Sequence, residues 1–158
     1  MQDLSETNFE DAEQAEYGVP GVLLIGEIGC RGKIVIAVRK FLEILGGADD
    51  PDPMVETSLY SYQVVVRGVG RDKGSVFRWD NDHPYWLHPG HPDPHHKHLF
   101  DWRTGDELKD PPTYSPQWVG ADDWPHLNEV IEQARNWYHA NSAELPYPNG
   151  FPTLNRPR

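Results

Sequence analysis

The stretch LYSYQVVVRGVGRDKGSVFRW, residues 59–79, decides the fold. Its two ends are rich in β-branched and aromatic side chains, and the turn Gly70–Gly74 lies between them. We therefore predict two antiparallel strands. Because successive side chains of a strand point to opposite faces, Tyr60 and Tyr62 share one face, and Arg78 points away from the face of its two aromatic neighbours.

The segments on either side extend this sheet. Apolar, β-branched runs at 22–25 and 33–38 are separated by the glycine-containing segment 29–32, which predicts an N-terminal hairpin. Residues 99–102 predict a last short strand. The sheet is expected to be antiparallel because its strands follow one another through short turns.

Two loops and one helix complete the prediction. Four prolines and no apolar periodicity make 82–94 a loop, and 110–123 is another. The acids and the proline of 122–125 are typical of a helix start, and apolar residues at three-and-four spacing predict an amphipathic helix over 124–140. The expected fold class is α+β, with a single antiparallel β-sheet, a C-terminal α-helix packed on one face and a His/Pro-rich loop.

The chain of 158 residues has the length of one domain. Residues 1–16 carry six acids and no base, and we interpret them as an acidic disordered arm whose deletion leaves the fold intact. The domain itself is expected at 17–142. Residues 143–158 form a proline-rich tail that wraps on the surface or is disordered.

Composition excludes several classes of protein. No apolar run is long enough to span a bilayer, which predicts no membrane contact, and the single cysteine, Cys30, excludes an internal disulfide and a four-thiolate zinc site. We expect a cytoplasmic protein.

A net charge of −11 argues against nucleic-acid binding, but the acidic arm accounts for more than half of it. Residues 57–103 are close to neutral.

Six of the eight histidines fall within sixteen residues of this near-neutral region. Imidazoles serve as acids and bases near neutral pH and as metal ligands, so three uses remain open: structural capping of the loop, metal binding and catalysis. The histidines are His83, His88, His91, His95, His96 and His98.

Each chemical use selects particular residues. A divalent metal would take His96 and His98, which alternate onto one face of an extended chain, with Asp80 or Asp82 as an oxygen ligand. Metal-free catalysis needs imidazoles for proton transfer and a cation beside the developing charge, and needs no cofactor. His95, His98, Arg78 and Lys97 are the catalytic candidates, and Tyr62, His96 and His83 are candidates for binding the substrate.

Four short motifs follow one another in a specific order. They are Tyr60-Ser61-Tyr62, then Phe77-Arg78-Trp79-Asp80-Asn81, then His83-Pro84, then His95-His96-Lys97-His98. Their order and approximate spacing resemble the TumE family of small prokaryotic toxin-type proteins over about residues 22–139. The resemblance implies the toxin of a two-gene toxin-antitoxin module, whose partner is a cognate antitoxin protein with a DNA-binding domain.

Small toxins of this kind most often act on RNA or on its translation, so we expect an endoribonuclease with an RNA substrate, which works by histidine acid-base chemistry. The alternatives are a non-catalytic interaction protein and a metal-binding domain that uses the His-rich loop. Geometry gives the sharpest expectation: His95, His96 and His98 should converge with Arg78 at the rim of the sheet beside Tyr62, where the chain enters and leaves the loop.

Overall fold

The computed structural model describes residues 19–47, 49–81, 95–120 and 122–155. The expected arm at 1–16 and the His/Pro-rich loop at 82–94, which includes Asp82 and His83, lie outside the described residues.

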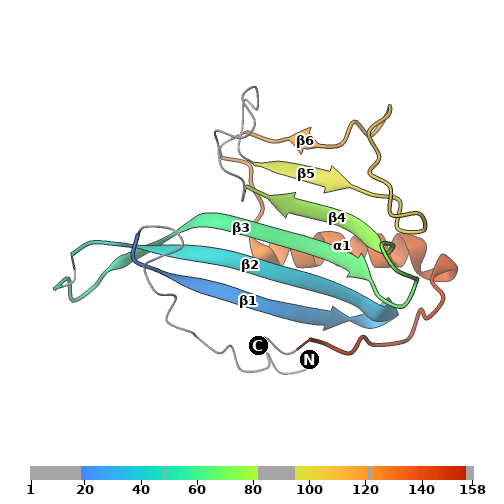
Figure 1. The fold of residues 1–158 in the computed structure, drawn as a ribbon, viewed down its shortest axis with the longest axis horizontal. Helices are drawn as coiled ribbons and strands as arrows, with labels where there is room; N and C mark the ends of the chain where they lie inside the picture. The colour runs from blue at the N-terminus through green and yellow to red at the C-terminus, as the bar shows by residue number, and fades with distance from the viewer. Residues whose placement is uncertain (1–18, 48, 82–94, 121, 156–158) are drawn as a thin grey trace.

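A six-stranded antiparallel sheet with consecutive neighbours forms the body of the molecule (Figure 1). A 3-10 turn at Arg31–Lys33 joins the first two strands, and Gly32 takes a φ of 80° there, which a residue with a Cβ would adopt only with strain. The strands are β1 Gly21–Cys30, β2 Ile34–Leu45, β3 Met54–Val66, β4 Ser75–Asp80, β5 His96–Leu99 and β6 Gln117–Trp118.

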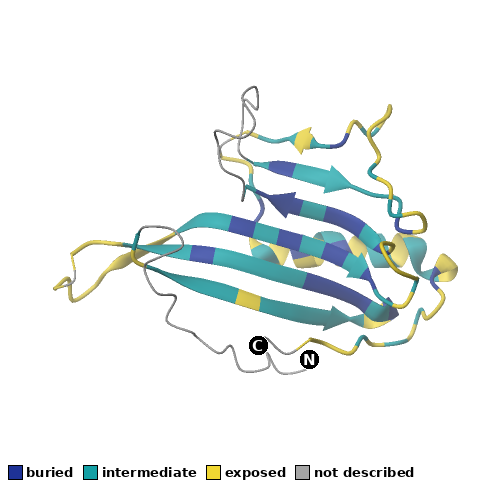
Figure 2. Ribbon diagram, in the orientation of Figure 1, coloured by how far each residue is buried: buried dark blue, intermediate teal, exposed yellow. Residues whose placement is uncertain are grey.

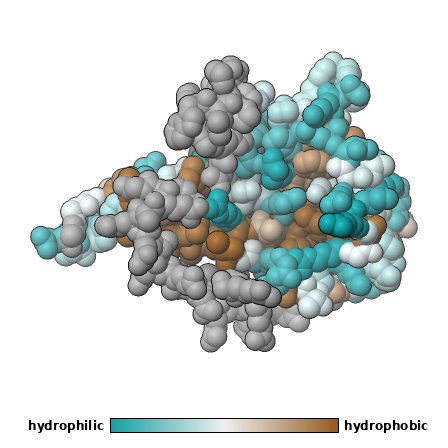
Figure 3. Space-filling model, viewed as in Figure 1, coloured by the Kyte–Doolittle hydropathy of each residue, from teal (hydrophilic) through white to brown (hydrophobic). Residues whose placement is uncertain are grey.

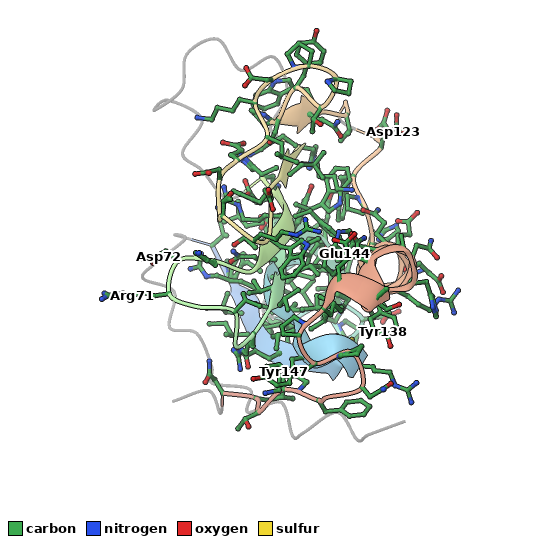
Figure 4. The ribbon with its side chains drawn as sticks, turned by 90° about the vertical axis from the view of Figure 1, so that its right-hand side faces the viewer. Arg71, Asp72, Asp123, Tyr138, Glu144 and Tyr147 are labelled. Carbon is green, nitrogen blue, oxygen red and sulfur yellow. The ribbon has the colours of Figure 1, made fainter. Side chains whose placement is uncertain are left out.

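One helix, α1 Leu127–Asn141, lies across one face of this sheet (Figures 1 and 4). Val130 and Ala134 on its inner side are buried, and the central strands β2, β3 and β4 carry most of the buried side chains beneath it (Figure 2). Tyr60 and Tyr62 stack on this face with ring centroids 5.1 Å apart. The predicted fold class is confirmed, and we name the opposite side of the sheet the open face.

Three boundaries differ from the prediction. The last predicted strand, 99–102, is shifted: β5 begins at His96, and beyond Leu99 only a single bridge from Phe100 to Glu107 continues the pairing. The predicted loop 110–123 contains β6, which pairs with the start of β5. The helix begins at Leu127 rather than at 124, because Trp124 stacks on Tyr60 at 5.1 Å instead of entering the first turn.

The C-terminal tail lies against the second half of β1 and the turn that leads into β2. After the short 3-10 helix Ser142–Glu144, the Gly150 carbonyl accepts a hydrogen bond from the Lys33 amide at 2.9 Å. Farther along, the Asn155 amide donates to Glu27 at 2.7 Å. Figure 4 shows Tyr138 and Tyr147 on either side of the point where the helix gives way to the tail.

Candidate functional site

The pairing of β4 with β5 sorts the motif residues onto two faces. Arg78 lies opposite His98, and Asp80 lies opposite His96. Residues that oppose each other in an antiparallel pair project from the same face, so these four side chains share the open face. The alternating positions face the helix instead, among them Lys97, which opposes Trp79.

The four side chains and Glu107 form what we name the open-face cluster: Arg78, Asp80, His96, His98 and Glu107. The His96 Nε2 lies 2.8 Å from Asp80 Oδ1, while the guanidinium of Arg78 contacts the other oxygen of the same carboxylate. The rings of His96 and His98 meet edge to face with centroids 4.8 Å apart. The cluster therefore combines two imidazoles, two carboxylates and one guanidinium.

Glu107 orients the ring of His98. Its Oε1 lies 2.6 Å from His98 Nδ1, and the Ser115 hydroxyl donates to the same oxygen at 2.6 Å. A carboxylate only accepts, so the proton of neutral His98 sits on Nδ1 and the lone pair sits on Nε2. Among the described residues, that buried Nε2 has no hydrogen-bond partner. The ring thus holds an oriented and unused lone pair.

The electrostatics of the cluster favour ionised carboxylates and a neutral His98. Burial raises the pKa of Asp80, but the hydrogen bond from His96 and the charge of Arg78 outweigh it, so the net shift is downward. The pKa of Glu107 is likewise lowered on balance, through its bonds with Ser115 and His98, against the effect of burial. Burial lowers the pKa of His98, although the hydrogen bond with Glu107 opposes this shift.

The helix face holds two of the expected catalytic residues. Lys97 donates to Gln133 of α1 at 2.9 Å, its ammonium lies 4.5 Å from the centroid of the Phe77 ring, and burial lowers its pKa. His95 Nδ1 lies 3.0 Å from the Tyr60 hydroxyl, and the His95 ring stacks at 5.6 Å on Trp124. Both side chains are held by packing on the side away from the open-face cluster.

The expected convergence is therefore right for His96, His98 and Arg78 and wrong for His95, which directly precedes β5 and turns its side chain to Tyr60 and Trp124 on the helix face. Tyr62 also lies on the helix face, directly opposite Trp79. Burial leaves the Tyr62 hydroxyl fully enclosed and raises its pKa to about 12, so it does not reach a substrate on the open face.

The metal candidates come together as a group. One potential ligand atom from each of Asp80, His96 and His98 lies within 4.8 Å of the others. The sequence spacing suggested this trio through the alternation of His96 and His98, and the pairing of β4 with β5 supplies the carboxylate. The other oxygen candidate, Asp82, lies outside the described residues.

A row of side chains crosses the open face on either side of the cluster. The strand register places Arg39, Ser61, Asp80, His96 and Trp118 side by side on β2 to β6. Arg39 is two strands from Asp80, a separation of roughly 10 Å, which adds a second cation to the face. Figure 3 views this side and shows hydrophilic residues above a band of hydrophobic ones.

Sequence reasoning did not single out Glu107, Ser115 or Arg39. Glu107 and Ser115 reach the cluster from irregular segments after β5, where neither periodicity nor a motif gives a signal. Arg39 did carry a sequence signal, because it is a charged residue directly after the apolar run 34–38. The register with β3 then places it beside Ser61.

The comparisons with known proteins give one match. The family model described as Toxin TumE matches residues 16–132, which include the open-face cluster and the first part of α1. No curated protein and no solved structure matches the chain. Within the described residues, no helix combines the length and the apolar character needed to cross a membrane.

Proposed function

This chain belongs to the TumE toxin family, and from this premise we propose that it is an endoribonuclease toxin that cleaves RNA at the open-face cluster. Membership in the family implies a cognate antitoxin. We propose that this antitoxin carries a DNA-binding domain and that the toxin acts on RNA in the cytoplasm.

The observation that carries the proposal is the orientation of His98. An ionised carboxylate, Glu107, holds Nδ1 at 2.6 Å and leaves the Nε2 lone pair available as a proton acceptor. The same carboxylate stabilises the imidazolium that forms when Nε2 takes a proton. A lowered pKa keeps His98 neutral at the pH at which a base is needed.

Arg78 supplies the charge that phosphoryl chemistry requires. It lies opposite His98 and its side chain is 36% exposed, so a phosphate can bind it from solvent. Such a phosphate competes with Asp80 for the guanidinium. For a 2′-hydroxyl to reach the buried Nε2 of His98, side chains around it must move when the RNA binds.

The proposed reaction begins when His98 Nε2 takes the proton of a ribose 2′-hydroxyl. The 2′-oxygen then bonds to the adjacent phosphorus while the bond from phosphorus to the 5′-oxygen breaks. The 5′-oxygen leaves with a proton, which His96 or water donates. The products are a 2′,3′-cyclic phosphate and a 5′-hydroxyl end, and Arg78 faces the negative charge that develops on the phosphate oxygens.

The test compares histidines of the two faces in RNA cleavage and growth inhibition. Exchange of His98 for Ala removes the proton acceptor and should reduce cleavage by about 10²- to 10⁴-fold. Two variants serve as controls and should retain cleavage provided that they fold. They are His95→Ala, whose side chain lies on the helix face, and His139→Ala, on the exposed side of α1. A folded His98→Ala protein with full activity would refute the assignment.

Arg78→Lys tests the second group. Lysine keeps the charge but loses the planar fork, so cleavage should fall if Arg78 grips a phosphate through two hydrogen bonds. Unchanged cleavage would leave Arg78 as a partner of Asp80 only.

A second candidate, a non-catalytic interaction protein, is favoured by a different observation. Arg78, Asp80 and His96 already pair with one another, as residues of a purely structural network would. Under this alternative, purified protein cleaves no RNA, and the His98→Ala variant inhibits growth as strongly as the parent.

A further inference from the structure

We propose that Asp80, His96 and His98 bind a divalent transition-metal ion such as Zn²⁺, and that this ion competes with proton transfer for the lone pair of His98. The binding part of the inference stands on geometry alone. The competition part rests on the proposed function, because it matters only if His98 accepts a proton from the substrate.

The positions of the ligand atoms support binding. The three potential ligand atoms lie within 4.8 Å of one another, and His96 Nε2 is 2.8 Å from Asp80 Oδ1. Zinc binds imidazole nitrogen and carboxylate oxygen at about 2.0–2.2 Å, so tetrahedral ligands are about 3.3–3.5 Å apart. An inward movement of His98, together with a slight separation of His96 from Asp80, would therefore close the site, with the fourth position left to water.

The surroundings of His98 are those of a metal ligand. Metal-bound histidines almost always give their second ring nitrogen to a carboxylate or a carbonyl, which fixes the tautomer and turns the lone pair toward the ion. Glu107 does this for His98, and Ser115 in turn holds Glu107. The buried Nε2 lacks a hydrogen-bond partner among the described residues, and an ion would provide one.

The donor set selects the kind of metal. Two imidazoles with one carboxylate suit zinc, cobalt and nickel, whereas magnesium and calcium prefer oxygen ligands throughout. The positive charge of Arg78 beside Asp80 opposes a cation, but the guanidinium contacts the other oxygen of that carboxylate, so the ion would bind Oδ1 in place of the proton through which Oδ1 now pairs with His96 Nε2. Asp80 and Glu107 carry two negative charges, which outweigh the single positive charge of Arg78 and leave the cluster with a net negative charge before an ion binds.

Calorimetry on untagged, metal-free protein tests the binding. One equivalent of Zn²⁺ should bind to the parent and to His139→Ala, and Mg²⁺ should give no saturable heat. His98→Ala should lose the site, while Glu107→Gln, which keeps the shape but loses the charge, should weaken affinity by about 10- to 100-fold. Equal zinc affinity in His98→Ala and the parent would place the metal on other histidines and overturn the proposal.

Cobalt gives a readout that does not depend on the variants. Co²⁺ added to the parent protein should produce the intense visible absorption bands of a tetrahedral site, and one equivalent of Zn²⁺ should remove them. A weak octahedral spectrum would overturn the assignment even if every cluster variant failed to fold.

The competition is tested in RNA cleavage. Zn²⁺ at saturating concentration should abolish cleavage by the parent protein, and a chelator should restore it. Cleavage that needs zinc would overturn the competition while leaving the site in place. If the parent binds zinc by calorimetry but cleaves no RNA under any condition, the proposed function fails and the metal site stands.

Discussion

Glu107 determines which nitrogen of His98 carries the proton, and through this the chemistry of the open-face cluster. Its carboxylate lies 2.6 Å from Nδ1, so the neutral ring has one tautomer. The glutamate does not touch the substrate in the proposed reaction. It is a positioning residue. Without it, neutral His98 would populate both tautomers, and Nε2 would carry the lone pair in only one of them.

The lowered pKa of His98 predicts how stability changes with pH. Above the unfolded pKa of about 6.5 the ring is neutral in both states. As the pH falls, the unfolded chain takes up the proton first, so the folded protein loses stability until the lower, folded pKa is passed. Asp80 does not interfere in this window, because it is ionised in the unfolded chain at its ordinary pKa of about 3.9 and its pKa is lower still in the folded protein.

We therefore expect that the free energy of unfolding, measured with denaturant, decreases from about pH 7.5 to about pH 5.5, and that it decreases less in His98→Gln than in the parent. The comparison with the variant separates His98 from the other histidines. An identical decrease in the two proteins would show that His98 titrates normally in the fold.

The sequence predicted those residues of the site whose positions follow from the alternation of side chains along a strand. Arg78, His96 and His98 were expected together because they flank one loop on neighbouring strands, and they are together. Glu107 was not expected, because its place depends on the turn at Gly105, where φ is 87°, and on the single bridge to Phe100. Such contacts arise from the folded chain as a whole and leave no local pattern.

At the level of elements, a single glutamine joins α1 to the sheet by two hydrogen bonds. The Gln133 side-chain oxygen accepts from Trp79 Nε1 at 3.0 Å and from Lys97 Nζ at 2.9 Å. Both donors belong to strands, β4 and β5, whose opposite faces carry the open-face cluster. The helix thus fixes the two strands from behind.

Exchange of Gln133 for Met keeps the volume but leaves two donors without their acceptor. An unsatisfied buried donor costs about 1–3 kcal/mol, and more when it is charged, so thermal and denaturant unfolding should show a loss of at least that size. Asn136→Ala, on the exposed side of the same helix, should change stability by less than about 0.5 kcal/mol. Equal stability of the two variants would show that water replaces the Gln133 oxygen as the hydrogen-bond acceptor for Trp79 and Lys97.

Long, periodic elements were the ones that the sequence predicted well. The four β-branched strands and the helix have a periodicity of their own, which burial on one face enforces. β6 has only two residues and exists through its pairing with β5, so its own residues gave no signal. The start of the helix was misplaced because the acids of 122–125 imitate a cap, while the aromatic stacking of Trp124 decides the true boundary.

At the scale of the whole molecule, the C-terminal tail ties together parts of the chain that are far apart in sequence. Arg67 donates to the Thr153 carbonyl and to Glu27, which also accepts from the Asn155 amide. Leu154 and Pro152 lie 3.1 Å from the place that a Cβ of Gly29 would occupy. The tail therefore packs closely on the β1–β2 hairpin.

A chain that ends at Pro146 should be less stable than the parent by about 1–3 kcal/mol, since it loses these hydrogen bonds and the apolar contact with β1. A chain that ends at Asn155 is the control and should keep the parent's unfolding midpoint. The shorter chain should still cleave RNA under conditions in which it is folded, because the open-face cluster is built from β4, β5 and the segment up to Ser115. If the shorter chain is as stable as the control, the tail lies on the surface without contributing to the free energy of unfolding.

The alternation in β4 and β5 also governs how this protein can change over generations. The odd-numbered residues Phe77, Trp79 and Lys97 pack under the helix. The even-numbered residues lie on the open face: Arg78, Asp80, His96 and His98. The register of Asp80 with His96 is set by the hydrogen bonds between β4 and β5. Loss of a single codon within β5 would reverse the faces of the β5 residues on one side of the deletion, while β4 kept its own alternation. A shift of one residue in β5 would therefore turn a histidine away from the open face and destroy the cluster.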